Sequence, residues 1–428
     1  MNGNGRRVAI IDGCRTPFTR SGTAFKELSA VELGKAAVKG LIARSELDVE
    51  QVDHVIYGTV VQSVQEPNIA REVLLGAGIP PRVPAFTVGR ACASSNQAIT
   101  SGAEHILIGH AEVVVAGGAE SLTDVPILFS PEMRNALVRA SKARSLGERV
   151  QAFRALRPRH LAPVTPAIAE PTTGLTMGES AERMAKQNGI SREAQDRWAL
   201  RSHQLAAAAT EDGRLTREIV PVYLADGVVD RDNGIRADTS LEKLAQLRPV
   251  FDKKFGTVTA GNASPLTDGA SAVLLMSEEK AKALGYRPLG YIRSYAYAAL
   301  APGDQLLQGP SYALPVALER AGLGIRDLDL VEIHEAFAAQ VLSNLQWWGS
   351  AEVAREKLGL ARAIGVPDEE TINVLGGSIA IGHPFGATGG RITVTLLNEL
   401  RRRGGQFGLI SVCAAGAMGF VMVVEAAA

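Results

Sequence analysis

Short apolar runs bounded by glycine alternate along the chain with longer stretches rich in alanine and leucine. The short runs carry the β-branched residues typical of buried strands, and the longer stretches have the length and composition of helices. We expect strands at 8–11, 52–61, 112–116 and 270–276, and again at 290–293, 328–333, 406–412 and 420–424. The alternation predicts an α/β fold, in which helices cover a buried sheet.

The last part of the chain repeats the order of elements found in the first part. Helices are expected at 91–108 and at 386–400. Each precedes a strand that ends in a turn of small residues, Ala-Gly-Gly-Ala at 116–119 and Cys-Ala-Ala-Gly at 413–416. Because α/β proteins alternate in this way in general, the pattern alone leaves an unduplicated sheet as an alternative. We favour a duplicated, five-layered α/β/α/β/α body.

A long insertion separates two strands of the first copy. The expected division is an N-terminal half at 1–121 with 253–289, an inserted loop domain at 122–252, and a C-terminal half at 290–428. A helix is expected at 191–210 within the insertion, with Ser191 as its N-cap. Insertions of this length between strands typically cover or shape a site.

Composition narrows the functional classes. Lys plus Arg and Asp plus Glu number 45 each, so the overall charge gives no argument for nucleic acid as a partner. We expect no signal peptide and no transmembrane segment, because no apolar run of about 18 residues is present. The three cysteines, Cys14, Cys92 and Cys413, are too few for a disulfide framework and lack CxxC spacing. A cytoplasmic location fits best.

Cys92 lies in Gly-Arg-Ala-Cys-Ala-Ser-Ser-Asn at 89–96, a turn of small residues that opens the first expected helix. Amide groups at a helix N-terminus stabilise an anion, so this position favours a thiolate with a lowered pKa. The alternative is a buried structural cysteine, and for Cys92 taken alone that alternative is the better one.

Three further segments carry reactive side chains. His383 stands in the glycine-rich run 376–390, where it could deprotonate a thiol or donate to an oxyanion. This run matches neither the phosphate-binding GxxxxGK pattern nor GxGxxG after a strand. Cys413 and His334 each follow an expected strand, and ligands bind at the carboxyl ends of strands. The doubled sheet therefore predicts one shared site for all four segments.

Three segments together resemble the active-site motifs of the thiolase family: Cys-Ala-Ser-Ser at 92–95, the run 376–390, and Cys-Ala-Ala-Gly at 413–416. They occur in the family's order, and the resemblance extends over essentially the whole chain. It implies the thiolase fold and ping-pong acyl transfer with coenzyme A as co-substrate and no bound cofactor or metal. Cys92 would carry the acyl group, His383 would generate its thiolate, and Cys413 would move the second proton.

The same resemblance implies the supporting residues. His334 would hold a water that acts with His383 on the enolate oxygen, and the backbone N–H groups of Cys92 and Ala415 would form a second oxyanion hole. Gly-Asn-Ala-Ser at 261–264 resembles a family motif near the CoA pantetheine. The implied contacts to substrate or CoA are Ser264, Met177, Phe337 and Gly416.

Other details point to a branch of the family. His-Glu-Ala-Phe at 334–337 replaces the commoner Asn-Glu-Ala-Phe and, with 257–260 and 122–126, is similar to the thiolase subunit of the fatty-acid trifunctional complex. Thr176 stands where small tetrameric thiolases often carry a histidine. We therefore expect thiolytic cleavage of 3-oxoacyl-CoA in fatty-acid β-oxidation, with an acetoacetyl-CoA thiolase acting on short chains as the alternative.

Two other relatives with this fold are disfavoured. A ketoacyl synthase would replace the second cysteine by histidine or asparagine, whereas this chain has Cys413. A non-catalytic lipid-binding relative would be expected to have lost Cys92 or His383. Cys14 is interpreted as structural, because thiolases usually have a small residue there.

The resemblance also implies a homo-oligomer, at least a dimer, because thiolase sites are completed across a two-fold interface. A partner subunit with hydratase and dehydrogenase activities is a second hypothesis. It rests on a basic run in the insertion, made of Arg134, Arg139, Lys142, Arg144, Arg149, Arg154, Arg157 and Arg159. The same run could instead form a solvated helix face, bind CoA phosphates or contact an anionic membrane surface.

Overall fold

The structure is a computed structural model that describes residues 5–164 and 169–427. Ten of its strands form one sheet, in the order β10-β11-β12-β9-β1-β8-β5-β3-β4, with β2 beside β8. These strands are β1 (Val8–Arg15), β2 (Thr19–Arg20), β3 (His54–Gly58), β4 (Ala85–Val88), β5 (Val113–Glu120), β8 (Thr267–Ser277), β9 (Gly290–Ala299), β10 (Leu330–Ile333), β11 (Phe407–Ala414) and β12 (Met418–Ala426).

The sheet consists of two copies of one arrangement. In the first copy β1, β8, β5 and β3 lie side by side, and in the second β9, β12, β11 and β10 do so in the same order. In each copy the last two strands are parallel and the other neighbours antiparallel. The copies join where β1 pairs with β9 over two residues. The doubled α/β fold is confirmed, while the domain boundaries expected from the sequence stay a prediction.

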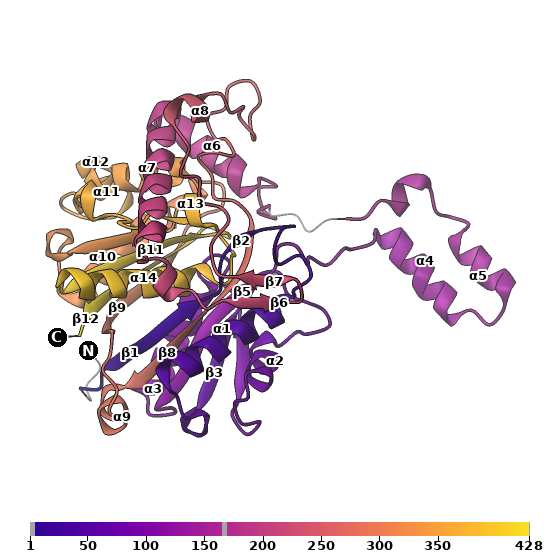
Figure 1. Cartoon of the computed structure of the whole chain (residues 1–428). Coiled ribbons are helices and arrows are strands. Elements are labelled where there is room, and N and C mark those ends of the chain that lie inside the picture. Colours follow the sequence, from indigo (N-terminus) through magenta and orange to yellow (C-terminus); the bar gives the residue numbers. More distant parts are fainter. Residues whose placement is uncertain (1–4, 165–168, 428) are drawn as a thin grey trace.

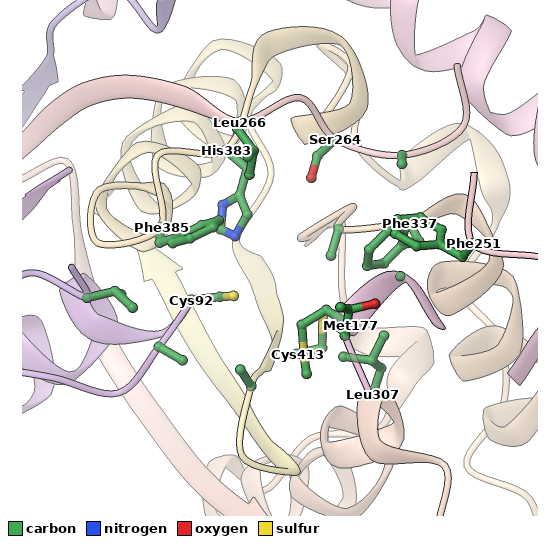
Figure 2. Close-up of a pocket in the computed structure, with 17 residues that line it drawn as sticks. Cys92, Met177, Phe251, Ser264, Leu266, Leu307, Phe337, His383, Phe385 and Cys413 are labelled. Carbon is green, nitrogen blue, oxygen red and sulfur yellow. The ribbon is translucent and has the colours of Figure 1, made fainter. Parts of the chain in front are cut away.

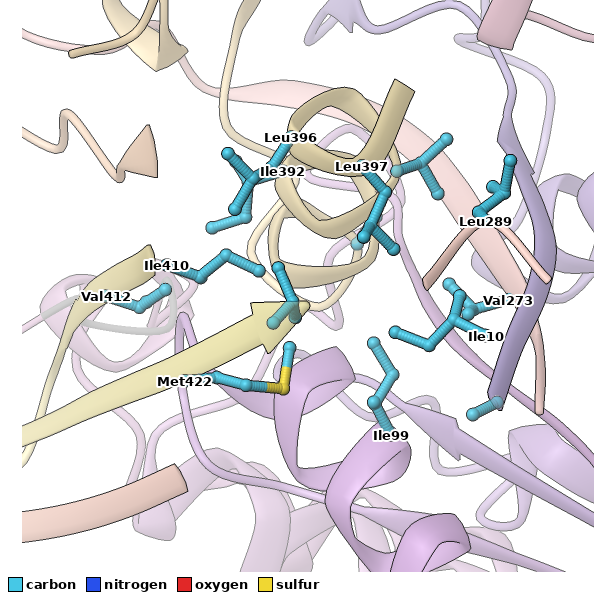
Figure 3. Packing of buried hydrophobic residues seen from close by; sticks show 14 of the residues in the cluster. Ile10, Ile99, Val273, Leu289, Ile392, Leu396, Leu397, Ile410, Val412 and Met422 are labelled. Carbon is cyan, nitrogen blue, oxygen red and sulfur yellow. The ribbon is translucent and has the colours of Figure 1, made fainter. Parts of the chain in front are cut away.

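The two copies of the sheet form two layers of the fold, and helices form three more (Figure 1). In the middle layer, α3 (Ser94–Leu107) and α14 (Thr388–Arg403) contribute residues such as Ile99 and Leu396 to a core shared with both copies of the sheet (Figure 3). On the outer face of the first copy lie α1 (Ala30–Ser45) and α2 (Ile69–Gly76). On that of the second lie α10 (Gly309–Ala321) and α11 (Ala338–Gly349), followed by α12 (Ala351–Lys357). Helix α9 (Glu278–Ala283) connects the copies.

The insertion between β5 and β8 has two parts. Its first part is a hairpin of α4 (Pro131–Lys142) and α5 (Leu146–Phe153), which projects away from the body in Figure 1. Its second part contains α6 (Met177–Gln187), α7 (Arg192–Glu211), the hairpin β6 (Val222–Leu224) and β7 (Gly227–Val229), and α8 (Leu241–Ala245). The Ser191 hydroxyl accepts from Ala194 N–H and caps α7, as the sequence predicts.

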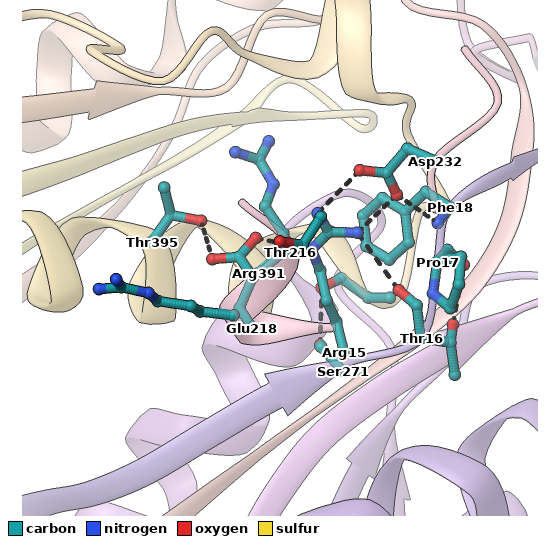
Figure 4. Close-up of polar contacts among 12 residues, drawn as sticks. Arg15, Thr16, Pro17, Phe18, Thr216, Glu218, Asp232, Ser271, Arg391 and Thr395 are labelled. Carbon is teal, nitrogen blue, oxygen red and sulfur yellow. Dashed lines mark hydrogen bonds and ion pairs between the residues drawn. The ribbon is translucent and has the colours of Figure 1, made fainter. Parts of the chain in front are cut away.

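Buried ion pairs attach this second part to both copies (Figure 4). Arg15 on β1 donates to both carboxylate oxygens of Asp232 at 2.6 and 2.8 Å and to Glu218 at 2.6 Å. Thr395 on α14 donates to the other oxygen of Glu218 at 2.8 Å. Because all these side chains are buried, each needs its partner, and the insertion is held in one position.

The elements expected from the sequence are present with shifted ends. The short strands β2, β4, β6 and β7 and the helices other than α3, α7 and α14 were not predicted. Strand β4 is a four-residue edge strand between Pro84 and Gly89, too short to show a periodic pattern. Helix α3 begins at Ser94, so Cys92 lies just before it. Among the described residues, no helix is long and apolar enough to cross a membrane.

Candidate active site

The reactive segments meet around a mostly apolar cavity of about 350 Å³. Both copies of the fold and the insertion contribute to it. Figure 2 shows the Cys92 sulfur and the His383 ring directed into the same space, with Cys413 and Met177 across from them. The other lining residues are Val60, Ala91, Thr176, Gly178, Phe251, Ala263, Ser264, Leu266, Leu307, Ala336, Phe337, Phe385 and Ala415.

Cys92 is presented by a strained turn. Ala91 has a φ of 45°, a conformation unusual for a residue with a Cβ, and the chain enters α3 directly afterwards. The backbone N–H groups of Ala415 and of Cys92 itself point at the sulfur and lower the pKa of the thiol. Burial acts in the opposite direction and is the larger effect, so the pKa rises to about 11. The expectation of a lowered thiol pKa was therefore wrong.

His383 is held by a threonine five residues later in the chain. Thr388 Oγ1 lies 2.6 Å from His383 Nδ1 and donates its own proton to the Pro384 carbonyl at 3.2 Å. Because a hydroxyl has one proton, Thr388 accepts from His383 Nδ1–H, and this assignment leaves Nε2 unprotonated. Burial, with a smaller contribution from the Arg391 charge, lowers the pKa of His383 to about 3. His383 is therefore a neutral base facing the cavity.

His334 lies beside His383 and is fully buried. The two ring centroids are 4.0 Å apart, and donor atoms of Cys92, His334 and His383 all lie within 4.8 Å of one another. His334 Nδ1 is 2.9 Å from the Ser378 hydroxyl. Burial, then His383, then Arg391 lower the pKa of His334 well below its usual value. Neither imidazole Nε2 has a hydrogen-bond partner among the described residues.

A sulfur and two imidazole nitrogens at this spacing are a donor set that zinc uses. The group contains no carboxylate, and the Arg391 guanidinium lowers the pKa of both histidines through its charge. The same positive field disfavours a divalent cation. The sequence-based expectation of no metal at this site stays a prediction.

Two buried carboxylates hold the loops that carry the histidines. Glu335 accepts hydrogen bonds from Trp198 Nε1, Ser202 Oγ, Asn373 Nδ2 and Ile379 N–H at 2.8–3.2 Å. Glu120, at the end of β5, accepts from the backbone N–H groups of residues 60, 61 and 386. Burial nevertheless raises the pKa of Glu120 to about 7. These contacts join the His383 loop to the copy that carries Cys92.

The glycines around His383 allow segments to approach closely. A Cβ on Gly389 would lie 2.0 Å from the side-chain oxygen of Asn96, and one on Gly118 would lie 2.0 Å from the Gly386 carbonyl. One on Gly377 would lie 2.3 Å from the Glu335 carboxyl group. The glycines therefore let the His383 loop pack directly against neighbouring segments.

The residues expected to contact substrate are distributed as follows. Met177, Ser264 and Phe337 line the cavity, and so does Cys413, whose pKa burial raises well above its usual value. Gly416 is not among the lining residues and lies in the turn after β11 with a φ of 83°. Their roles toward substrate stay predictions.

Cys14 lies away from this site. Its buried thiol donates to the Ala37 carbonyl, and burial raises its pKa to about 12. These features agree with the structural role predicted for it.

Two family models match the chain. "Thiolase, N-terminal domain" matches residues 8–279, and "Thiolase, C-terminal domain" matches residues 286–426. Together they include all four segments around the cavity. This chain belongs to the thiolase family.

Known thiolases are similar to this one over nearly the whole chain. The 3-ketoacyl-CoA thiolase of Shewanella pealeana is 52% identical, covering 99% of this chain and 98% of its own. That of Aeromonas salmonicida is also 52% identical, covering 98% and 97%.

Solved thiolase structures are also similar to this chain over nearly its whole length. The acetyl-CoA acetyltransferase of Bacillus anthracis superposes with a TM-score of 0.84 at 38% identity, covering 98% of this chain and 99% of its own. Human mitochondrial 3-ketoacyl-CoA thiolase in complex with CoA does so with a TM-score of 0.84 at 35% identity, covering 99% and 98%.

Sequence analysis missed several residues that position the thiolase site. Thr388 and Ser378 lie in the glycine-rich run, where their small size concealed their role as partners of the histidines. Glu120 is the last residue of the apolar strand β5, and a lone acidic residue at that position was the available signal. Arg391 is buried in α14 and gave no signal beyond interrupting an apolar face.

Proposed function

We propose that this thiolase catalyses CoA-dependent thiolytic cleavage of 3-oxoacyl-CoA, which yields acetyl-CoA and a shortened acyl-CoA. The observation that carries the proposal is the convergence of Cys92, His383 and Cys413 on one apolar cavity. Such a cavity suits an acyl chain, because its lining offers few groups that would hydrogen-bond to water. The 3-ketoacyl-CoA thiolases that are 52% identical to the chain support the same substrate class.

The first half-reaction begins with a neutral pair. The pKa of Cys92 lies above that of His383, so the proton rests on sulfur in the free enzyme. Attack on the 3-keto carbon and proton transfer to His383 Nε2 must therefore be coupled. His383 then carries an Nε2–H that can stabilise an oxyanion, and cleavage leaves an acetyl-CoA enolate that Cys413 protonates.

The second half-reaction uses the same groups in the opposite sense. Cys413 removes the thiol proton of incoming CoA, and the CoA thiolate attacks the thioester on Cys92. The N–H groups that point at the Cys92 sulfur, those of Ala415 and Cys92, are placed to stabilise the tetrahedral intermediate. Met177, Ser264 and Phe337 would contact the substrate or the pantetheine arm.

Loss of absorbance of the Mg²⁺–3-oxoacyl-CoA complex on adding CoA measures this activity. Cys92→Ser should abolish it, because a serine hydroxyl has a far higher pKa than a thiol. Profiles with chains of increasing length separate a 3-ketoacyl-CoA thiolase from the short-chain alternative. If the wild-type enzyme cleaves no chain length, or if Cys92→Ser keeps its rate, the proposal fails.

We further propose that the enzyme is at least a dimer. The edge strand β4 has no neighbour on one side among the described residues, and it leads directly to the Cys92 turn. Edge strands of this kind are often covered by a second chain. Light scattering during size-exclusion chromatography would give the mass, and a monomer at micromolar concentration would contradict the proposal.

We propose that the α4–α5 hairpin binds a partner subunit with hydratase and dehydrogenase activities. Its basic side chains do not line the cavity that holds the reactive groups. Leu146 and Val150, which follow basic residues in the sequence, are apolar residues on α5 that are 79% and 73% exposed. Co-purification of the native protein tests the proposal, and a homo-oligomer alone would count against it. We also propose a cytoplasmic location, supported by the three free cysteines.

A further inference from the structure

A buried hydrogen-bond chain runs from Arg391 through Ser378 to His334. Arg391 NH2 on α14 donates to the Ser378 hydroxyl at 3.0 Å, and Ser378 Oγ lies 2.9 Å from His334 Nδ1. All three side chains are at most 1% exposed. Within the described residues Ser378 Oγ has no other partner, so its one proton has one acceptor.

The direction of this chain follows from its first member. A guanidinium is donor-only, so Ser378 must accept from Arg391. The Ser378 oxygen could accept a second hydrogen bond, but its proton has no acceptor among the described residues other than His334 Nδ1. Because a buried hydroxyl proton without an acceptor is costly, the geometry favours an unprotonated Nδ1 on a neutral imidazole. The remaining proton is on His334 Nε2, which has no hydrogen-bond partner among the described residues. One nitrogen of the His334 ring lies within 4.8 Å of the Cys92 sulfur.

We propose that Arg391 and Ser378 are positioning residues that fix the proton of His334 on Nε2, so that His334 is a permanent hydrogen-bond donor to the water that acts with His383 on the enolate oxygen. This inference rests on the proposed thiolase reaction. It assigns opposite tautomers to two neighbouring imidazoles, because Thr388 leaves His383 Nε2 free to accept. One ring is the base and the other is the donor.

The burial of Arg391 agrees with this role. Its nearest carboxylate oxygen belongs to Glu332 and is 3.6 Å away, and Arg391 Nε and NH1 have no hydrogen bond among the described residues. So poorly paired a buried cation is a net cost to folding. The requirement for an orienting group is specific to histidine, because an asparagine at this position has two amide protons that cannot move to another atom.

Ser378→Ala tests the proposal without changing the charge of the site. Without the hydroxyl, the His334 proton can move to Nδ1, and Nε2 is then no longer a hydrogen-bond donor. We expect kcat to fall about tenfold or more, with KM changed less than about twofold, because the lost donor acts on developing charge. Ser343→Ala is the matched control, since Ser343 is equally buried and its hydroxyl has no partner among the described residues.

The same substitution in a His334→Asn background separates orientation from structure. An amide needs no tautomer, so adding Ser378→Ala to His334→Asn should change kcat less than about twofold. If Ser378→Ala lowers kcat by the same factor in both backgrounds, Ser378 is merely structural and the proposal is wrong.

¹⁵N NMR of histidine-labelled wild-type enzyme tests the tautomer without turnover and without any variant at Ser378. The His334 signal, identified by its absence in His334→Asn, should show protonated Nε2 and unprotonated Nδ1. Protonated Nδ1 would overturn the inference even if thiolysis is normal. Failure of the proposed function would instead appear as no thiolysis by an enzyme with the expected spectrum.

Discussion

The reactivity of Cys92 toward alkylating agents should rise steeply with pH, because the thiol is neutral in the free enzyme. Burial raises its pKa from the ordinary 9.0 to about 11, against the two N–H groups that point at the sulfur. Two units of pKa lower the thiolate fraction below pH 9 by about a hundredfold. The low pKa of His383, about 3, means that the imidazole does not hold the proton instead.

Iodoacetamide labelling followed by peptide mass spectrometry measures this property site by site. The second-order rate constant for Cys92 should increase about tenfold per pH unit between pH 7 and pH 9. Cys14 is the internal control, since its buried thiol should remain unlabelled while the protein is folded. The same peptides from unfolded protein give the reactivity of an ordinary thiol.

A pH-independent rate constant between pH 6 and pH 8 would refute the reasoning. Such a plateau requires a thiolate–imidazolium pair at rest, in which the N–H groups and the histidine charge outweigh burial. Thiolysis would then start from a preformed nucleophile. The coupled proton transfer of the proposed first step would be unnecessary.

Three other outcomes are expected. Glu335→Gln leaves one acceptor oxygen for four donors, so it should destabilise the enzyme by roughly 2 kcal/mol or more in urea unfolding and lower kcat; wild-type stability would contradict this. Gly118→Ala should lower kcat at least about tenfold by displacing the His383 loop, whereas Gly303→Ala, with open space around it, should not. Burial, then Arg236 and Arg20, lower the pKa of His203 to about 4, so the contribution of the neutral imidazole to stability is present above pH 6.5 and lost as the pH falls toward 4. In thermal melts, the melting temperature of His203→Gln should therefore fall less between pH 6.5 and pH 4 than that of the wild type.

The sequence by itself predicted the α/β alternation, favoured its duplication and identified the reactive residues. Each strand and helix is predicted from a short stretch of sequence, and the same order of strands and helices occurs in both halves of the chain. Cys92, His383 and Cys413 stand in short motifs that indicate their chemistry only when they are taken together as a resemblance to the thiolase family. Short edge strands such as β4 were not predicted, because four half-exposed residues show no alternation of apolar and polar positions.

Only the tertiary structure decided the proton positions and the pKa values. The pKa of Cys92 depends on how much protein surrounds its sulfur, and that surrounding comes from segments more than 300 residues away, including Ala415. The tautomers of His334 and His383 depend on Ser378 and Thr388, two hydroxyls that look like spacers in a glycine-rich run. The burial of a group and the direction of its hydrogen bonds depend on the residues that surround it in space. The residues next to it in the sequence do not specify these neighbours.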